Sequence, residues 1–386
     1  RDVTGVQTCA LPIFSGNEKL YINIDKGVQN MDSLSFEKTF TIDSLSPRYN
    51  VNQTSEVYTI HFTSTELLLS QQQKVNQSYK GRYSDMVSSI LKNYLNVKES
   101  PELGSIYPSS GTQNITIPNL TPFEAINWIT RRAISDKGVP EFIFHENIQG
   151  YNFMPLSTWY SFDSLFTIQT GIKNVLDDHG AEMLTARDYE IVSQFNSLDA
   201  VSDGVYASKF VGFDPLTRTI NTRYNKTFED VYSKTNHTNG DKSKNVFNPM
   251  TAKLTPSSTK PFSKMYDSKV VLYPYETPRL TSDYVKKNGV KTLNTINSPE
   301  TYLIERRSIL ANLFQKRIKF TMPGNFGLFS AGMIGVAMRK RGVTDNQDIL
   351  DMSLTGRYII VSARHTIRYD KHETLIEVAS DSSLME

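Results

Sequence analysis

The chain has 386 residues, of which 38% are hydrophobic and 21% are charged, and its formal net charge at pH 7 is +2. This length accommodates two to four domains with sizeable cores, and a net charge so near zero gives no general argument for nucleic-acid binding. The sequence shows no apolar run of the roughly 20 residues that a bilayer-spanning helix needs, and its single cysteine, Cys9, excludes a disulfide framework.

The amino terminus carries the stretch DVTGVQTCALPI at residues 2–13. This stretch is typical of a translated sequencing-library adapter, so we expect residues 1–13 to be an artefact and the genuine protein to begin near Phe14, with its natural N-terminus lost. Cys9 lies inside the stretch. The genuine protein is then expected to contain no cysteine in this region and no thiolate metal site.

Alternating apolar and polar residues follow in three segments, at 20–24, 36–42 and 57–62. A period of two predicts strands, and together these segments predict part of an antiparallel barrel. Residues 66–73 are polar and rich in glutamine, which predicts a connector. We place a domain boundary near residue 78.

Two helices are predicted next. The first has Ser84 as its N-cap and carries an apolar stripe of Val87, Ile90, Leu91, Tyr94 and Leu95. The second begins at Thr121-Pro122-Phe123-Glu124, where the Thr121 hydroxyl accepts from the Glu124 amide and the Glu124 carboxylate reaches back to the amide of Thr121. Gly138 and Pro140 end this second helical region.

A hairpin completes this region. Aromatic and apolar residues at 142–144 and 151–153 flank a five-residue loop, Glu146 to Gly150. The two helices are therefore expected to cover a sheet. Helix and strand elements are also predicted within residues 159–172 and 187–201.

In the second half of the chain, apolar and polar residues alternate again at 204–211 and 219–222, which predicts a hairpin that turns at Asp214-Pro215. Residues 233–263 are rich in Asn, Thr, Ser, Lys and Pro and predict a surface excursion. Ser298-Pro299 begins a helix. Further strands are predicted at 317–322, 331–338, 358–365 and 374–380, with the last two joined by residues 370–373.

These motifs, in this order, resemble the central baseplate hub subunit of T-even-type contractile-tailed bacteriophages. The resemblance is strongest over residues 79–154, through the segment from Ile117 to Trp128 and the hairpin from Glu146 to Phe153, and continues more weakly to about Ser383. It implies a β-rich α+β fold with two similar antiparallel β-barrel (tube) domains plus an α+β outer domain.

Position along the chain then divides it as the resemblance implies. Residues 14–77 are the remnant of the first tube barrel, 78–202 plus 226–297 the outer domain, 203–225 plus 298–381 the second tube barrel, and 382–386 a tail. The family's first barrel has N-terminal strands that this chain lacks. An exposed sheet edge left there is an aggregation hazard.

The resemblance also implies a non-enzymatic virion protein of the tail baseplate, made in the host cytoplasm. It implies a homotrimeric ring whose central channel joins the tail tube to the cell-puncturing spike. The implied partners are the spike or tail lysozyme protein, the tail tube or tape-measure end, and baseplate wedge proteins, with DNA passing only as cargo and no membrane insertion. The alternatives are a hub-spike protein of a contractile secretion system and a carbohydrate-active enzyme built on β-barrels.

Charge is unevenly distributed near the C-terminus. Residues 302–342 hold eight basic residues against one acid, whereas residues 343–386 hold eight acids against four Lys and Arg residues. A solvated face is the simplest interpretation. The alternative is a contact patch toward another subunit or partner. The residues of that possible patch are Arg306, Arg307, Arg339, Lys340 and Arg341.

We predict no catalytic, cofactor-binding or metal-binding residues. His365 and His372 flank a predicted hairpin and are expected to come close, yet two imidazoles alone make a poor metal site. Asp177-Asp178-His179 is more typical of a polar turn than of an acid–base pair. The glycines at 324, 327, 332 and 335 lack the strand–glycine–helix setting of a phosphate loop and predict bends in strands.

Overall fold

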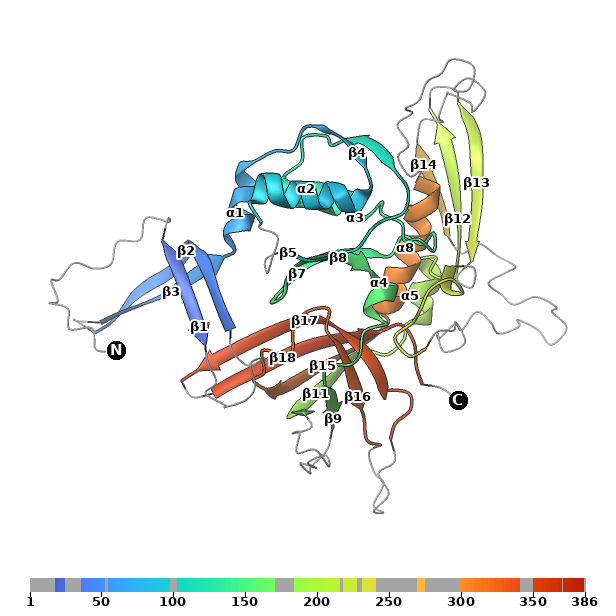
Figure 1. Cartoon of the computed structure of the whole chain (residues 1–386). Helices are drawn as coiled ribbons and strands as arrows, with labels where there is room; N and C mark the ends of the chain where they lie inside the picture. Colours follow the sequence, from blue (N-terminus) through green and yellow to red (C-terminus); the bar gives the residue numbers. More distant parts are fainter. Residues whose placement is uncertain are drawn as a thin grey trace.

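The structure is a computed structural model. It describes residues 18–24, 36–52, 55–97, 103–170, 184–215, 218–227, 231–240, 269–274, 299–340, 350–369 and 371–384. The adapter-like stretch, Asp177-Asp178-His179, Arg341 and most of the polar excursion lie outside these ranges. Within them, no helix is long and apolar enough to cross a membrane. Figure 1 shows an N-terminal meander, a helical layer over small sheets, and a curled sheet.

The N-terminal meander is antiparallel, with strand order β1-β2-β3, and it projects from the rest of the molecule (Figure 1). Its strands are β1 Lys19–Ile24, β2 Phe36–Asn52 and β3 Ser55–Thr63. The three predicted strands are confirmed. They form a separate three-stranded sheet that no other described strand joins, so the expected partial barrel is not seen among the described residues.

The predicted connector at residues 66–73 is wrong, because this segment is the helix α1, Thr65–Gln72. Glu66 lies in its first turn and Ser64 occupies the N-cap position. Three consecutive leucines and the glutamines are good helix formers, which outweighs the polar composition that suggested a loop.

The helical layer consists of α2, Tyr83–Leu95, and α3, Pro122–Thr130. The capping box of α3 is confirmed: the Glu124 amide donates to Thr121 Oγ1 at 3.4 Å, and the Thr121 amide donates to Glu124 Oε2 at 2.9 Å. The predicted cap of α2 is wrong, since Arg82 precedes the helix and Ser84 lies inside it. The Ser84 amide donates instead to Ser109 Oγ at 3.2 Å.

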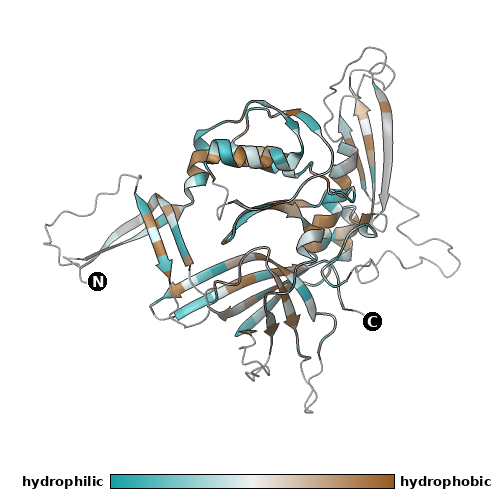
Figure 2. Ribbon diagram, viewed as in Figure 1, coloured by the Kyte–Doolittle hydropathy of each residue, from teal (hydrophilic) through white to brown (hydrophobic). Residues whose placement is uncertain are grey.

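Two small sheets accompany these helices, and the β5-β8-β7 sheet lies beneath them in the view of Figure 1. β4 pairs with β6, and β7 and β8 form the predicted hairpin with β5 alongside. Their bounds are β4 Ser78–Gly81, β5 Leu103–Ile106, β6 Gln113–Thr116, β7 Phe142–Asn147 and β8 Gly150–Pro155. The apolar face of α2, visible in Figure 2, packs into one core with α3, Phe142 and Phe153. The helix pair therefore covers a sheet, as predicted.

The hairpin turn is shorter than predicted. Only Ile148 and Gln149 separate β7 from β8, rather than a five-residue loop. The Gln149 amide donates to Asn147 Oδ1 at 2.9 Å, and Gly150 has φ 109°, a conformation that favours glycine. Local side-chain chemistry thus tightens the turn.

The curled sheet has seven strands in the order β10-β9-β16-β17-β18-β15-β11. The strands are β9 Thr167–Gln169, β10 Leu184–Thr185, β11 Asp188–Ser193, β15 Lys316–Pro323, β16 Met333–Ala337, β17 Gly356–Arg368 and β18 Lys371–Ser380. The predicted strands of the last third are confirmed. β10 and β11 are the two end strands of the sheet, and they are consecutive in the chain. β10 pairs with β9 and β11 pairs with β15, so the sheet curls until its two ends come together.

The strands are distributed differently from the predicted division of the chain. β9, β10 and β11 lie in the curled sheet although they were assigned to the outer domain, because Ile168 of β9 is fully buried in the core of that sheet. The hairpin β12–β13 was assigned to the second barrel but forms its own sheet with β14. These strands are β12 Ala207–Asp214, β13 Thr219–Thr227 and β14 Lys269–Pro274.

Short helices join these sheets around a shared core. They are α4 Leu156–Trp159, α5 Ser197–Ser202 and the longer α8 Pro299–Leu313, which begins where predicted. Residues 237–239 are held to the end of β18 by a buried polar network. His237 Nδ1 lies 2.8 Å from Asp381 Oδ2, and the amide and hydroxyl of Thr238 donate to Asp381 Oδ1 at 3.0 and 2.7 Å.

Candidate assembly interface

The strand β11 lies at one end of the strand order of the curled sheet. On one side it pairs with β15, with Ile191 opposite Ile318 and Ser193 opposite Arg317. On its other side no described strand pairs with it. An exposed edge strand is a template for pairing with another chain. β11 is six residues long, which is enough for a register-specific contact.

Large apolar side chains are exposed to solvent along this strand and just after it. Ile191 is 42% exposed, Phe195 58% and Leu198 81%. Phe195 and Leu198 flank the N-cap of α5, where the Asp199 amide donates to Asn196 Oδ1 at 3.1 Å. This cap fixes the path of the chain between the two apolar residues. We call β11 together with Phe195 and Leu198 the β11 edge.

The N-terminal meander is a second surface with apolar residues turned outward. Figure 2 shows apolar residues spread along its strands. Its large exposed residues are Tyr21, Leu45, Tyr49, Val57 and Phe62. Among its hydrophobic residues with described side chains only Ile42 is buried. A three-stranded sheet with so little buried area is marginally stable unless something covers it.

A groove of about 740 Å³ separates the meander from the curled sheet. Apolar side chains line much of it, and the Phe36 and Phe326 rings stack across it with centroids 5.5 Å apart. Lys38 on β2 forms an ion pair with Glu146 at the tip of the β7–β8 hairpin. These two contacts help to hold the meander against the body.

The predicted basic patch is divided between two elements. On α8, Arg306 Nη1 donates to the carbonyls of Pro140 and Phe142 at 3.2 and 2.7 Å, and burial together with Arg131 lowers its pKa to about 10. Arg307 pairs with Asp203 at 2.6 Å.

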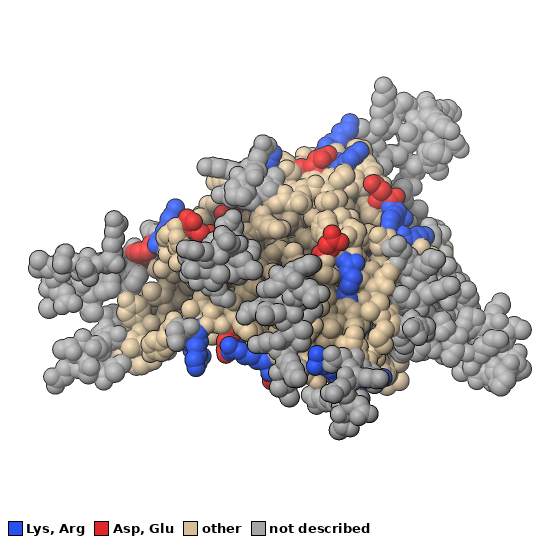
Figure 3. Space-filling view, turned by 60° about the horizontal axis from the view of Figure 1, so that its bottom comes forward, with Lys and Arg blue, Asp and Glu red and all other residues tan. Residues whose placement is uncertain are grey.

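The other two described members of the patch, Arg339 and Lys340, follow β16. The Arg339 amide donates to Thr170 Oγ1 at 3.2 Å, and Lys340 is exposed. In the face shown in Figure 3, basic side chains lie beside acidic ones at most positions. A role of these residues in partner contact stays a prediction.

The two histidines of the β17–β18 hairpin come together as predicted. His365 Nδ1 lies 3.3 Å from His372 Nε2, and both rings pack against Phe326 with centroids 4.8 and 4.6 Å away. Burial, with His372 nearby, lowers the pKa of His365 to about 4, so its ring is neutral at pH 7. Across the described residues, no three His, Cys, Asp or Glu side chains are placed to hold a metal ion.

The glycine series lies where the chain makes close approaches. A Cβ on Gly324 would fall 1.9 Å from Cγ of His372, and one on Gly327 would fall 2.9 Å from the Phe166 ring. These glycines therefore make room for aromatic rings beside the curled sheet. No phosphate-binding role is needed to explain them.

Sequence reasoning missed the β11 edge. Residues 187–201 were expected to contain helix and strand, but nothing local marks β11 as an edge, because edge position depends on pairing with β15, more than 120 residues later. The available signal was weak: Ile191, Phe195 and Leu198 are apolar residues set in a polar segment.

Comparison with known proteins gives the following. No protein family and no curated protein matches the chain. Among solved structures, it is similar to the tail protein from Neisseria meningitidis MC58, with a TM-score of 0.46 and 11% identity over 90% of this chain and 83% of that one. For the 43 kDa tail protein of prophage MuSo2 from Shewanella oneidensis, the TM-score is 0.45 and the identity 9%, over 93% and 88% of the two chains. For the prophage tail protein gp18 from Listeria monocytogenes EGD-e, the TM-score is 0.37 and the identity 10%, over 94% and 84%.

Proposed function

We propose that this chain is a structural subunit of a phage tail, and that it acts as the baseplate hub of a contractile tail. Three copies form a ring with a central channel that joins the tail tube to the cell-puncturing spike. The remaining partners are those that the family resemblance implies, namely the tape-measure end and baseplate wedge proteins. The proposed location is the tail baseplate of the virion.

The observation that carries this proposal is the β11 edge. A subunit of a closed ring needs two surfaces that meet in a head-to-tail contact. β11 supplies backbone donors and acceptors, while Ile191, Phe195 and Leu198 supply apolar area beside them. A strand added at such an edge gains main-chain hydrogen bonds as well as side-chain specificity.

The exposed meander gives independent support. Its outward apolar residues suit a sheet that a neighbouring copy completes. Permanent interfaces of this kind bury more than about 2,000 Å² and are apolar at their centres. The β11 edge of one copy and the meander of the next are the two surfaces that we place in contact.

The mass of the full chain in solution tests the proposal. Sedimentation equilibrium is expected to give a species of three times the chain mass of 43.8 kDa. Ile191→Lys places a charge in the proposed contact and is expected to shift the equilibrium toward single chains, whereas Ile191→Val is expected to keep the trimer. A single-chain mass for the unaltered protein at all concentrations would overturn the proposal.

A further inference from the structure

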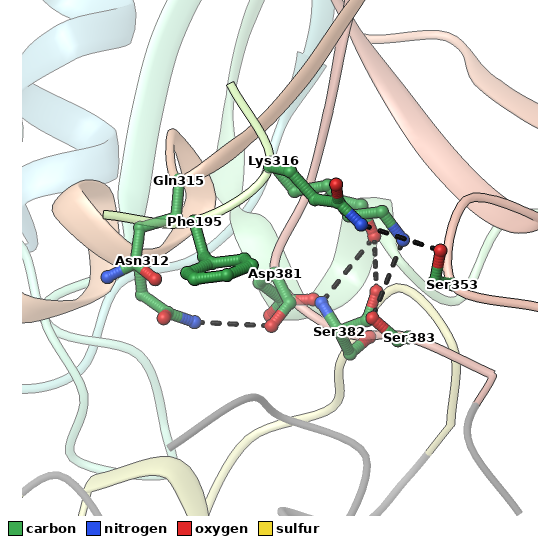
Figure 4. A pocket seen from close by; sticks show the side chains of 10 residues that line it. Phe195, Asn312, Gln315, Lys316, Ser353, Asp381, Ser382 and Ser383 are labelled. Atoms are coloured by element: carbon green, nitrogen blue, oxygen red, sulfur yellow. Dashed lines mark hydrogen bonds between the residues drawn. The ribbon is translucent and has the colours of Figure 1, made fainter. Parts of the chain in front are cut away.

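A second feature lies where β11 ends, and it does not depend on the proposed function. A cavity of about 180 Å³ opens there between the segment after β11, the end of α8 and the end of β18. Figure 4 shows its lining, in which Lys316 lies near Ser383, while Phe195 lies beside Asn312 and Asp381.

Lys316 is the unusual member of this lining. It is the first residue of β15, and the strand alternates so that its side chain is directed inward with Ile318 and Phe320. Its residue exposure is only 6%. Lysine is almost never buried to this extent unless its charge is paired.

The ammonium of Lys316 has few partners. Nζ lies 3.5 Å from Ser383 Oγ, a long hydrogen bond, and 5.1 Å from the centroid of the Tyr358 ring. No carboxylate of the described residues lies within 4 Å of it. Burial lowers its pKa to about 8, against the attraction of Asp351, so it still carries its charge at pH 7.

The acid that lines the same cavity is already engaged. Asp381 binds His237 through Oδ2 at 2.8 Å and Thr238 through Oδ1 at 2.7 and 3.0 Å. Its carboxylate therefore neutralises the buried imidazole and not Lys316. The cavity keeps one positive charge with hydroxyl groups around it.

We infer that this cavity binds a carboxylate group, with the Lys316 ammonium as its counter-charge and the Ser383 hydroxyl beside it. One positive charge near Asp351 and Asp381 suits a monoanion better than a phosphate dianion. The Phe195 ring provides an apolar wall for the remainder of the ligand. Two sources share this chemistry: a small free carboxylate, or an Asp or Glu side chain of a second copy of the chain.

Nuclear magnetic resonance of the full chain labelled with ¹³C at the lysine ε-carbon tests the inference. The Lys316 signal is identified by its low pKa and by its loss in Lys316→Met. Sodium propionate is expected to raise the pKa of this signal in dilute protein if the site takes a free carboxylate. If a second copy supplies the group, the same rise is expected from increasing protein concentration without propionate. A pKa that moves in neither arm overturns the inference.

A matched pair of variants checks the role of the charge. Lys319 lies on the same strand with its side chain on the outer face, near Glu190 at 3.8 Å. Hydrogen bonds to charged groups are worth about 1.5–3 kcal/mol, so Lys316→Met is expected to weaken propionate binding or self-association by roughly ten- to hundredfold. Lys319→Met is expected to leave both unchanged. Equal effects of the two substitutions would contradict the assignment. If Lys316→Met does not fold, the inference is tested by the lysine titrations of the unaltered chain with propionate and with increasing protein concentration.

Discussion

The buried pair of His237 and Asp381 gives the sharpest test of how the fold is held together. Their side chains are 1% and 5% exposed, and Nδ1 lies 2.8 Å from Oδ2. The other ring nitrogen, Nε2, lies 3.0 Å from the Tyr232 carbonyl oxygen. Because both ring nitrogens face acceptors, both must donate, and His237 is a buried imidazolium paired with a carboxylate.

Asp381→Asn removes the charge and keeps the shape. The expected loss in free energy of unfolding is roughly 3–5 kcal/mol, because the substitution leaves a buried charge without its partner. Asp203→Asn is the matched control. Asp203 is half-exposed and pairs with Arg307 at 2.6 Å, so its loss is expected to cost at most about 1 kcal/mol.

The pair also makes stability depend on pH. Burial disfavours the charged ring of His237, but Asp381 outweighs it and the pKa of His237 is raised. Its contribution is therefore complete below the unfolded pKa of about 6.5 and is lost as the pH rises through the raised value. Asp381 has a lowered pKa because its bonds to His237 and Thr238 outweigh burial, so its contribution is complete above about pH 4 and is lost in acid.

Urea unfolding followed by tryptophan fluorescence measures both effects. As the pH rises above about 6.5, the loss of stability caused by Asp381→Asn is expected to shrink, because the unaltered chain then loses the contribution of the charged pair that the variant already lacks. The other buried groups near the pair, Tyr160, Tyr232 and Glu141, have raised pKa values from burial. If Asp381→Asn costs no more than Asp203→Asn, or if the two pH profiles are parallel, the reasoning is refuted.

Three further predictions follow from local contacts. Ile191→Lys at the β11 edge is expected to abolish self-association while lowering the free energy of unfolding of the single chain by only about 1 kcal/mol, because Ile191 is partly buried opposite Ile318; sedimentation and urea unfolding measure the two effects, and a folded trimer would contradict the edge contact. Thr121→Ala removes the cap of α3 and is expected to lower the free energy of unfolding by about 1 kcal/mol, whereas Thr121→Ser is expected to keep it; equal midpoints of all three chains would count against the cap. Gly324→Ala places a Cβ 1.9 Å from Cγ of His372. It is expected to cost roughly 1–3 kcal/mol in thermal unfolding, and adding His372→Ala is expected to recover part of that loss; additive effects would exclude the clash.

Elements whose signals are local could be predicted from the sequence. The capping box of α3 is contained in four consecutive residues, and the β17–β18 hairpin, including the approach of His365 to His372, follows from alternation on both sides of a short turn. In these cases the residues that decide the structure are neighbours in the chain.

Elements whose structure depends on residues far apart in the chain could not be predicted from the sequence. β14 pairs in parallel with β12, about 60 residues earlier, and β11 pairs with β15, more than 120 residues later. The burial of Lys316 depends on the end of β18 and on the segment after β11, which meet only in the folded chain. Sequence reasoning assigned Lys316 to a basic run, whereas the structure separates it from Arg306 and Arg339.

Electron microscopy of the purified full chain tests the central proposal most directly. The account predicts ring-shaped particles with three-fold symmetry and a central channel, in which the β11 edge lies at each boundary between subunits. In Ile191→Lys these rings are expected to be lost. Particles of a single chain, or a closed assembly with β11 exposed to solvent, would contradict the proposal.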